Sequence, residues 1–423
     1  MTGRTARMPT ARRILGIAPA FACAIAAAVA DAAPPDLTVE VVRGSEGRAV
    51  DAYLGACAVA GFGGVVLVVE NDEVVLHRAY GAADPETGRA NTIETRFDVG
   101  SIAKQIVATA MLVLQQDGRL AIDDPIALHV DGLVAAVPLD KRGVTIAHLL
   151  HHTSGLPVEL SGRIDYASAP AVASALLGAP LRSPPGTTFE YNNRGYSLAA
   201  MIVERVAGEP FEQFAHRRLF DAAGLTHTGF CRDEDIPDDV TACGTEDGTS
   251  FGPAVRASYA WGHRGATGLL TTPADLYRWL DVVRHGDLLN DASRASLFRP
   301  GLADYALGWF VRRMGDQTTI WHGGSTIGFE ALCSHERNER TGTERTIIQV
   351  SNSRGRSGTI PTIVGRILAG AGAPPKPATL DAPERAAMAG AFESAEGARI
   401  EIAAVGEFLR VAPANQAALD ALS

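Results

Sequence analysis

The pattern of apolar and polar residues divides the chain into two groups of predicted strands that flank a long region of predicted helices. In the first group, a helix over residues 48–60 precedes strands over 63–69 and 74–80, and Asn71-Asp72 forms the hairpin turn between the strands. The second group contains four strands and a closing helix, predicted over 306–312, 318–322, 329–335, 345–352 and 361–369.

Between these groups, apolar residues recur with the period of an α-helix. The first predicted helix begins at Ser101, and the others cover 145–151, 169–177, 195–206, 211–223, 272–285 and 293–298. Residues 231–258 are polar and rich in glycine, which is typical of a long loop. This order of elements indicates two α/β halves, about 48–100 and 300–372, with an all-helical insert over about 105–298.

Residues 1–32 are predicted to form a signal peptide, because Arg4, Arg7, Arg12 and Arg13 precede an apolar run that ends in small residues at Ala30-Asp31-Ala32. A membrane anchor is the alternative, but the apolar run over 14–30 is short and rich in alanine. We therefore expect a bacterial periplasmic or secreted protein with no stable membrane span after cleavage.

The remaining chain is predicted to comprise a catalytic domain over 33–372 and a linker with a short tail over 373–423. Pro374-Pro375-Lys376-Pro377 marks the linker, and two strands are predicted in the tail, over 398–404 and 407–412. Two strands alone are marginally stable. The tail is therefore expected either to pack on the main domain or to belong to a small β-domain.

Composition narrows the class of protein. The 423 residues are 46% hydrophobic with a net charge of −10, so a large core is possible and nucleic-acid binding is disfavoured. Beyond the leader, the cysteines are Cys57, Cys231, Cys243 and Cys333, and their spacing fits no zinc motif. Cys231 and Cys243 flank a polar loop, and the sequence leaves open whether they pair. No metal or cofactor is predicted.

The most informative stretch is Phe97-Asp98-Val99-Gly100-Ser101-Ile102-Ala103-Lys104-Gln105. Ser101 and Lys104 are three residues apart, so a helix places them on the same face. A serine hydroxyl becomes a good nucleophile when a neighbouring base takes its proton, and a lysine with a lowered pKa is such a base. The chain has only three lysines, and this one lies in the first turn of a largely apolar helix. A surface serine and lysine near a helix start are the alternative.

Two further stretches carry possible chemistry. In Glu190-Tyr191-Asn192-Asn193, a tyrosine with a lowered pKa would shuttle protons, and Asn193 would bind a substrate carbonyl and the lysine. In Trp321-His322-Gly323-Gly324-Ser325, paired glycines permit close approach of a substrate. The N–H groups of Ser325 and Ser101 would then form an oxyanion hole. A structural tyrosine and a simple turn are the alternatives.

Other catalytic motifs are missing from the sequence. It contains no His-Glu-x-x-His and no Walker motif. His151 and His152 are adjacent, so on a helix they would point apart and could not chelate one metal ion.

Taken together, these stretches resemble the serine β-lactamase and penicillin-binding protein superfamily, over about residues 61–368. More narrowly, they resemble its class C β-lactamase-related branch of esterases and D-stereospecific peptidases. Ser101-Ile-Ala-Lys104 matches Ser-x-x-Lys, Tyr191-Asn192-Asn193 matches Tyr-x-Asn, and His322-Gly323-Gly324 stands where the family has Lys-Thr-Gly or His-x-Gly. The segments Leu149–Leu156 and Gly265–Thr272 also fit.

The resemblance implies an α+β fold of the β-lactamase/transpeptidase type, with an antiparallel sheet flanked by helices and an inserted all-helical domain. It implies acyl transfer through Ser101, with Lys104 and Tyr191 as a coupled base pair. Asn193, His322, Gly323, Gly324 and Ser325 would bind the substrate. No cofactor is implied, and the oligomeric state stays open.

His322 departs from the lysine of β-lactamases, because a histidine is mostly neutral at pH 7. The sequence therefore favours an esterase or a peptidase for D-amino acid derivatives over an efficient β-lactamase. The alternative is a non-catalytic module that binds peptidoglycan fragments.

Overall fold

The computed structural model describes residues 35–160, 167–355, 359–372, 382–393, 399–405 and 408–413. The predicted signal peptide and most of the predicted linker lie outside these residues. In the part of the chain that is described, no helix is both long and apolar enough to cross a membrane.

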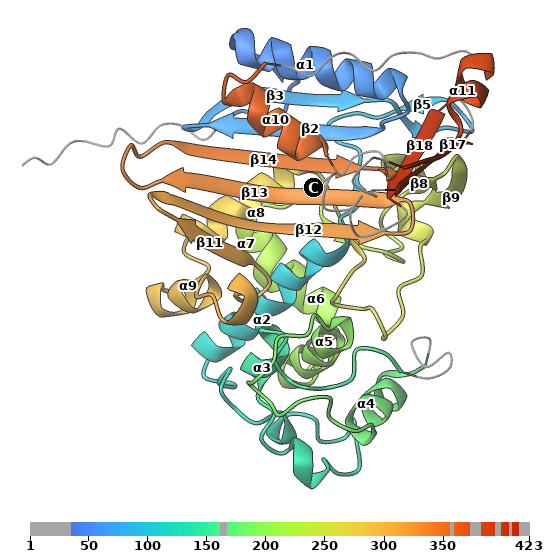
Figure 1. Cartoon of the computed structure of the whole chain (residues 1–423). Coiled ribbons are helices and arrows are strands. Elements are labelled where there is room, and N and C mark those ends of the chain that lie inside the picture. Colours follow the sequence, from blue (N-terminus) through green and yellow to red (C-terminus); the bar gives the residue numbers. More distant parts are fainter. Residues whose placement is uncertain are drawn as a thin grey trace, which may run out of the picture. The chain divides into compact units, whose positions relative to one another are not determined.

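A seven-stranded sheet, antiparallel throughout, forms the centre of the fold (Figure 1). Its strands, in spatial order, are β1 (Val41–Val42), β3 (Glu73–Tyr80), β2 (Gly64–Glu70), β14 (Glu344–Ser351), β13 (Phe329–Asn338), β12 (Gln317–Thr326) and β11 (Phe310–Met314). The first strand group thus pairs directly with the last, through β2 and β14. Asn71 and Asp72 both have positive φ, which confirms the predicted turn between β2 and β3.

Helices cover both faces of the sheet because alternate residues of its strands are apolar on each side. On one face, α1 (Gly44–Val59) and α10 (Ile360–Leu368) pack over Val66, Val68 and Ile347 (Figure 1). On the other face, Val65, Leu67 and Ile348 join the main core, which includes α2 (Lys104–Gln116) and α8 (Pro273–His285). The stretch that contains Ser101 and Lys104 therefore lies beneath this second face of the sheet, at the boundary with the insert.

The helices predicted to begin at 145 and 272 have N-terminal caps at those residues, and the insert contains most of the helices that the sequence predicts. They are α3 (Ile146–Leu150), α4 (Ala169–Gly178), α5 (Asn193–Ala207), α6 (Phe211–Ala215), α7 (Asp221–Ala223) and α9 (Asp291–Leu297), with a π-helical turn over His216–Phe220. The Thr145 hydroxyl accepts a hydrogen bond from the His148 N–H, and Thr272 does the same for Asp275.

The expected α+β class is confirmed, but the insert is not purely helical. It contributes β7 (Gly229–Phe230), β8 (Cys243–Glu246), β9 (Thr249–Pro253) and β10 (Leu269–Thr271). These strands form two small sheets, β6-β10-β7 and β15-β8-β9, together with β6 (Phe97–Asp98) and β15 (Ser353–Arg354). A further pair joins β4 (Ala82–Asp84) to β5 (Arg89–Ala90). Strands of two to five residues are too short to leave a clear periodic signal.

Two strand boundaries differ from the sequence prediction in a way that matters for the site. β11 begins at Phe310 rather than at 306, because the chain turns at Gly308, whose φ is +76°. β12 continues beyond His322 to Thr326, because β13 pairs with all of it. The glycines Gly323 and Gly324 are therefore strand residues and not a turn.

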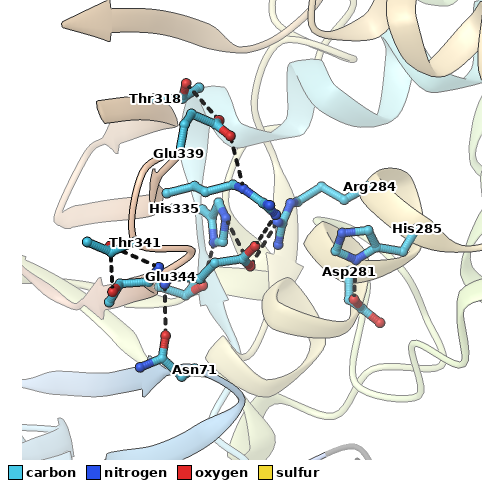
Figure 2. Close-up of polar contacts among 12 residues, drawn as sticks. Asn71, Asp281, Arg284, His285, Thr318, His335, Glu339, Thr341 and Glu344 are labelled. Atoms are coloured by element: carbon cyan, nitrogen blue, oxygen red, sulfur yellow. Dashed lines mark hydrogen bonds and ion pairs between the residues drawn. The ribbon is translucent and has the colours of Figure 1, made fainter. Parts of the chain in front are cut away.

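A polar network fixes α8 to the far end of the sheet (Figure 2). Glu344 of β14 accepts from the Arg284 guanidinium of α8 at 3.0 Å, and its N–H donates to Asn71 Oδ1 at 2.9 Å. Buried His335 contacts the Thr346 hydroxyl at 3.0 Å, and burial lowers the pKa of this histidine to about 3. The charged groups of this network pair with one another, Glu344 with Arg284 and Arg337, so the network has a structural role.

The cysteines of the described residues form no disulfide. Cys57, Cys231, Cys243 and Cys333 are free thiols, so Cys231 and Cys243 do not pair.

In the tail, the two predicted strands are present as β17 (Arg399–Val405) and β18 (Phe408–Pro413). They form a three-stranded sheet with β16 (Gly390–Glu393), after α11 (Ala382–Met388), which the sequence pattern did not indicate.

Candidate active site

Ser101 and Lys104 lie one helical turn apart at the start of α2. Ser101 belongs to the short 3-10 helix η1 (Gly100–Ala103), which continues into α2. The Lys104 amine lies 3.0 Å from Ser101 Oγ and donates to the carbonyl oxygen of Ala266 at 3.0 Å. Its side chain is fully buried, and this burial holds the pKa of Lys104 well below its usual value. A neutral amine at this distance can accept the serine proton.

Tyr191 approaches the same serine from the insert. It lines the same cavity as Ser101, which influences the pKa of its hydroxyl, and its ring centroid lies 4.8 Å from Lys104 Nζ. Burial nevertheless raises the pKa of Tyr191 to about 12, which corrects the expectation of a lowered pKa. This burial outweighs the influence of Ser101, which acts to lower the pKa. Tyr191 is thus a neutral phenol, suited to passing a proton and not to holding a negative charge.

Asn193 is the first residue of α5 and does not touch Lys104 through any described hydrogen bond. Its Oδ1 is buried and finds no donor among the residues described. Asn192 has the structural role, because its Oδ1 accepts from the Gly195 N–H at 3.1 Å and caps α5. Its Nδ2 also donates to the Leu156 carbonyl at 2.9 Å. The structure therefore brings Tyr191 to the serine, but no described hydrogen bond joins Asn193 to Lys104 as the sequence predicted.

The backbone of β12 presses directly against η1. A Cβ atom on Gly324 would lie 1.9 Å from the Val99 carbonyl oxygen, and one on Gly100 would lie 2.7 Å from the Ser325 nitrogen. Only glycine permits this approach, and Gly100 also has a φ of +51°. The contact places the N–H-bearing segments of Ser101 and Ser325 side by side, as an oxyanion hole requires.

His322 is a neutral imidazole at the cavity wall. It is 2% exposed, and burial, with a further contribution from Lys104, lowers its pKa to about 3. Nδ1 lies 2.6 Å from the Gly323 carbonyl oxygen, so this nitrogen carries the proton. Nε2 then accepts from the Tyr305 hydroxyl at 3.1 Å. The structure therefore strengthens the expectation that His322 provides no positive charge.

An aromatic cluster that the sequence did not reveal surrounds the lysine. His152 has a φ of +57°, and its ring lies 4.2 Å from that of Tyr191 and 4.6 Å from that of Tyr305. Its Nδ1 accepts from the Asn192 N–H at 3.0 Å. His151 contacts the Tyr305 carbonyl at 3.1 Å, and both histidines follow the end of α3 at Leu150. The apolar character of this cluster explains why the lysine is desolvated.

A cavity of about 640 Å³ opens at the serine. It is lined by Ser101, Tyr191, Phe310, His322, Gly323, Gly324, Ser325, Glu330, Ala331, Leu332, Gln349, Pro361 and Thr362. β11 pairs with β12 only up to Trp321, so residues 322–326 of β12 have a free edge beside the serine. Among the residues described, no group of three or more His, Cys, Asp or Glu could hold a metal ion.

The two glycines of β12 provide a matched pair of substitutions. Gly324→Ala should lower kcat/KM by about a hundredfold or more, because its Cβ would push β12 away from Val99 and misalign the oxyanion hole. Gly323→Ala is the control, since its Cβ would meet only the Ala331 carbonyl at 3.7 Å. Ester hydrolysis by the two purified variants measures the difference. Equal activities would show that the contact with Val99 has no part in the reaction.

A Ser–Lys–Tyr site between an antiparallel sheet and a helical insert is the arrangement of the β-lactamase/transpeptidase-like class. The model of the Beta-lactamase family matches residues 50–357, and the chain belongs to that family.

Relatives agree with this assignment. PbpX of Bacillus subtilis (strain 168), named as a penicillin-binding protein, is 29% identical over 286 residues, which cover 66% of this chain and 69% of PbpX. Protein flp of Staphylococcus aureus (strain NCTC 8325 / PS 47) is 24% identical over 282 residues, which cover 64% of this chain but only 56% of flp.

Solved structures show the same fold. The penicillin-binding protein homologue from Pyrococcus abyssi, described as octameric, has a TM-score of 0.65 at 20% identity and covers 88% of this chain and 89% of its own. The D-amino acid amidase from Ochrobactrum anthropi SV3 has a TM-score of 0.61 at 22% identity, and the match covers 78% of this chain and 99% of the amidase.

Proposed function

We propose that the protein is a secreted serine hydrolase that cleaves esters or amides through an acyl-enzyme on Ser101. The observation that carries the proposal is the buried amine of Lys104 at 3.0 Å from Ser101 Oγ, with its pKa lowered by burial. A lysine retained in this costly environment is typical of a catalytic base. Membership in the Beta-lactamase family supports hydrolase chemistry in general.

The reaction would proceed in two acyl-transfer steps. Ser101 Oγ attacks the substrate carbonyl while Lys104 takes its proton, and the N–H groups of Ser101 and Ser325 bind the oxyanion. As the leaving alcohol or amine departs, Tyr191 donates its proton to it and recovers one from Lys104. Water then attacks the acyl-enzyme with the same residues as base, and the carboxylic acid product leaves.

The cavity favours substrates that do not depend on a fixed positive charge. His322 is neutral because burial lowers its pKa to about 3. The free edge of β12 over residues 322–326 offers backbone donors and acceptors to an extended, peptide-like group. We therefore propose small esters or derivatives of D-amino acids in preference to β-lactams. The D-amino acid amidase among the similar structures has this fold, which is compatible with the proposal.

One substrate panel tests this function. Wild type is compared with Ser101→Ala on a short-chain nitrophenyl ester, a D-alanyl anilide, a D-Ala-D-Ala peptide and a chromogenic cephalosporin. Turnover of the ester or the D-amino acid substrates that is lost in Ser101→Ala supports the proposal. Labelling by a fluorescent fluorophosphonate is measured in parallel. Binding of peptidoglycan fragments with neither turnover nor labelling would favour the non-catalytic module instead.

The role of His322 in specificity gives a separate prediction. His322→Lys should raise activity toward carboxylate-bearing substrates, relative to neutral esters, by about tenfold, because it adds a positive charge at the cavity wall. His322→Gln is the control, since it also removes the imidazole but adds no charge. The ratio of kcat/KM for the cephalosporin and the nitrophenyl ester measures the effect. An unchanged ratio in His322→Lys would remove this residue from the specificity argument.

A further inference from the structure

Asp98 is a buried carboxyl group three residues before the nucleophile that the proposed reaction does not use. It lies in β6, is 5% exposed and pairs with Leu270 of β10. In the described part of the chain it forms no ion pair with a basic residue. Burial raises its pKa to about 6 despite hydrogen bonds that favour the ionised form. A buried carboxylate without a counter-charge costs stability, so its position calls for an explanation.

The Asp98 carboxyl group lies where three segments meet behind the oxyanion hole. Its Oδ1 accepts from the Gly100 N–H at 2.9 Å, which fixes the turn that leads to Ser101. The N–H of Gly268, just before β10, also favours the ionised carboxyl group. The Thr326 hydroxyl at the end of β12 is close enough to favour the ionised carboxyl group as well, and it forms no hydrogen bond to any other residue described. The carboxyl group thus faces both η1 and β12.

The two walls of the oxyanion hole need such a brace because they belong to different segments. Ser101 lies on η1 and Ser325 on β12, more than 200 residues later in the sequence. The free edge of β12 faces this position, so no neighbouring strand holds residues 322–326 from that side. The one hydrogen bond recorded for the Asp98 carboxyl group goes to the backbone N–H of Gly100, next to Ser101. Asp98 therefore acts on the site through the backbone.

Given the proposed acyl transfer, we propose that Asp98 is a positioning residue of the oxyanion hole. Its carboxyl group holds the Gly100 turn against the end of β12, so that the N–H groups of Ser101 and Ser325 point at the same oxygen. Asp98 does not touch the substrate and is not a catalytic residue.

Two substitutions at Asp98 separate positioning from a purely structural role. Asp98→Asn keeps an Oδ1 acceptor for Gly100, and its amide can donate to the Thr326 hydroxyl, so kcat should stay within about threefold of wild type. Asp98→Ala removes the brace and should lower kcat by about tenfold to a hundredfold with KM nearly unchanged, because misalignment affects the transition state more than substrate binding. Asp275→Asn, at a buried carboxylate on α8 that bonds Thr228, is the control and should leave kcat unchanged.

The stability of Asp98→Asn relative to wild type should depend on pH. Because the pKa of Asp98 is raised above 3.8 in the folded protein, the wild type loses stability as pH rises from about 4 to 6. Asp98→Asn should therefore melt above wild type at pH 8, and the difference should disappear below about pH 4. Among the described residues, Cys231 is the titratable neighbour whose pKa is affected by Asp98. Burial, with a further contribution from the charge of Asp98, holds the pKa of the Cys231 thiol well above its usual value.

The rate constant for labelling by a fluorophosphonate, measured beside ester turnover, keeps the test independent of the substrate. Phosphonylation of Ser101 also develops negative charge on oxygen, so Asp98→Ala should slow it in parallel with kcat. Wild-type kcat and labelling in Asp98→Ala would overturn the inference, and so would an Asp98→Asn variant as slow as Asp98→Ala. If wild type is labelled but turns over no substrate, the proposed function fails, while the labelling rates still test Asp98.

Discussion

Ser101→Ala should abolish hydrolysis of any ester or amide that the wild type cleaves, with a loss of at least about 10³-fold in kcat/KM. The reason is that the hydroxyl that forms the acyl-enzyme is removed, while the neighbouring N–H groups and the cavity remain. Covalent labelling by the fluorophosphonate should disappear in the same variant, because Ser101 is the cavity hydroxyl that lies 3.0 Å from the Lys104 amine in the described structure.

Ser325→Ala is the matched control for this substitution. It removes the other serine hydroxyl at the cavity but keeps the backbone N–H that would bind the oxyanion. Its activity should stay close to wild type. Substantial turnover or labelling in Ser101→Ala would show that another residue is the nucleophile and would refute the assignment.

Lys104→Met should lower kcat/KM by about 10² to 10⁴-fold, because the general base is lost and the volume of the side chain is largely kept. Its effect on stability should have the opposite sign. Between the lowered pKa of Lys104 in the folded protein and its ordinary value near 10.4, the unfolded chain binds one more proton. The free energy of unfolding of the wild type therefore rises with pH across this range, and the Met variant should lack that part of the slope.

Denaturant unfolding at several pH values and ester hydrolysis together measure both effects. Lys141→Met is a suitable control, because Lys141 is also buried but is paired with Asp140 at 2.6 Å and does not line the cavity. It should leave activity unchanged. A Lys104→Met variant with wild-type activity would exclude this lysine as the base, whereas equal losses in both variants would point to damage to the fold.

Much of the secondary structure could be predicted because its signals are local. Thr145 and Thr272 cap the helices that follow them, and Asn71-Asp72 turns between two strands, as their residue types indicate. The small sheets could not be predicted, because β6, β7 and β10 are two or three residues long and pair with segments far away in the chain. Such strands exist only where the tertiary fold brings their backbones together.

The candidate site likewise has features that could be predicted from local sequence and features that could not. Ser101 and Lys104 are three residues apart, so the helical repeat alone places the amine beside the hydroxyl. The protonation states could not be read from sequence. Burial lowers the pKa of Lys104, whose amine lies over the rings of Tyr191 and Tyr196, and burial also raises the pKa of Tyr191 to about 12, where a lowered value was expected. Desolvation depends on every surrounding group, and these groups come from separate parts of the chain.

The sequence by itself therefore determined the α+β class, the pairing of the serine with the lysine, and the absence of a lysine in the third motif. Only the tertiary structure decided that Lys104 and His322 are neutral, that β12 runs past its glycines with a free edge, and that Asp98 stands behind the oxyanion hole. The physical reason is range: helical spacing and capping act over a few residues. Burial, strand pairing and the alignment of two N–H groups, in contrast, require segments that are more than 200 residues apart to meet.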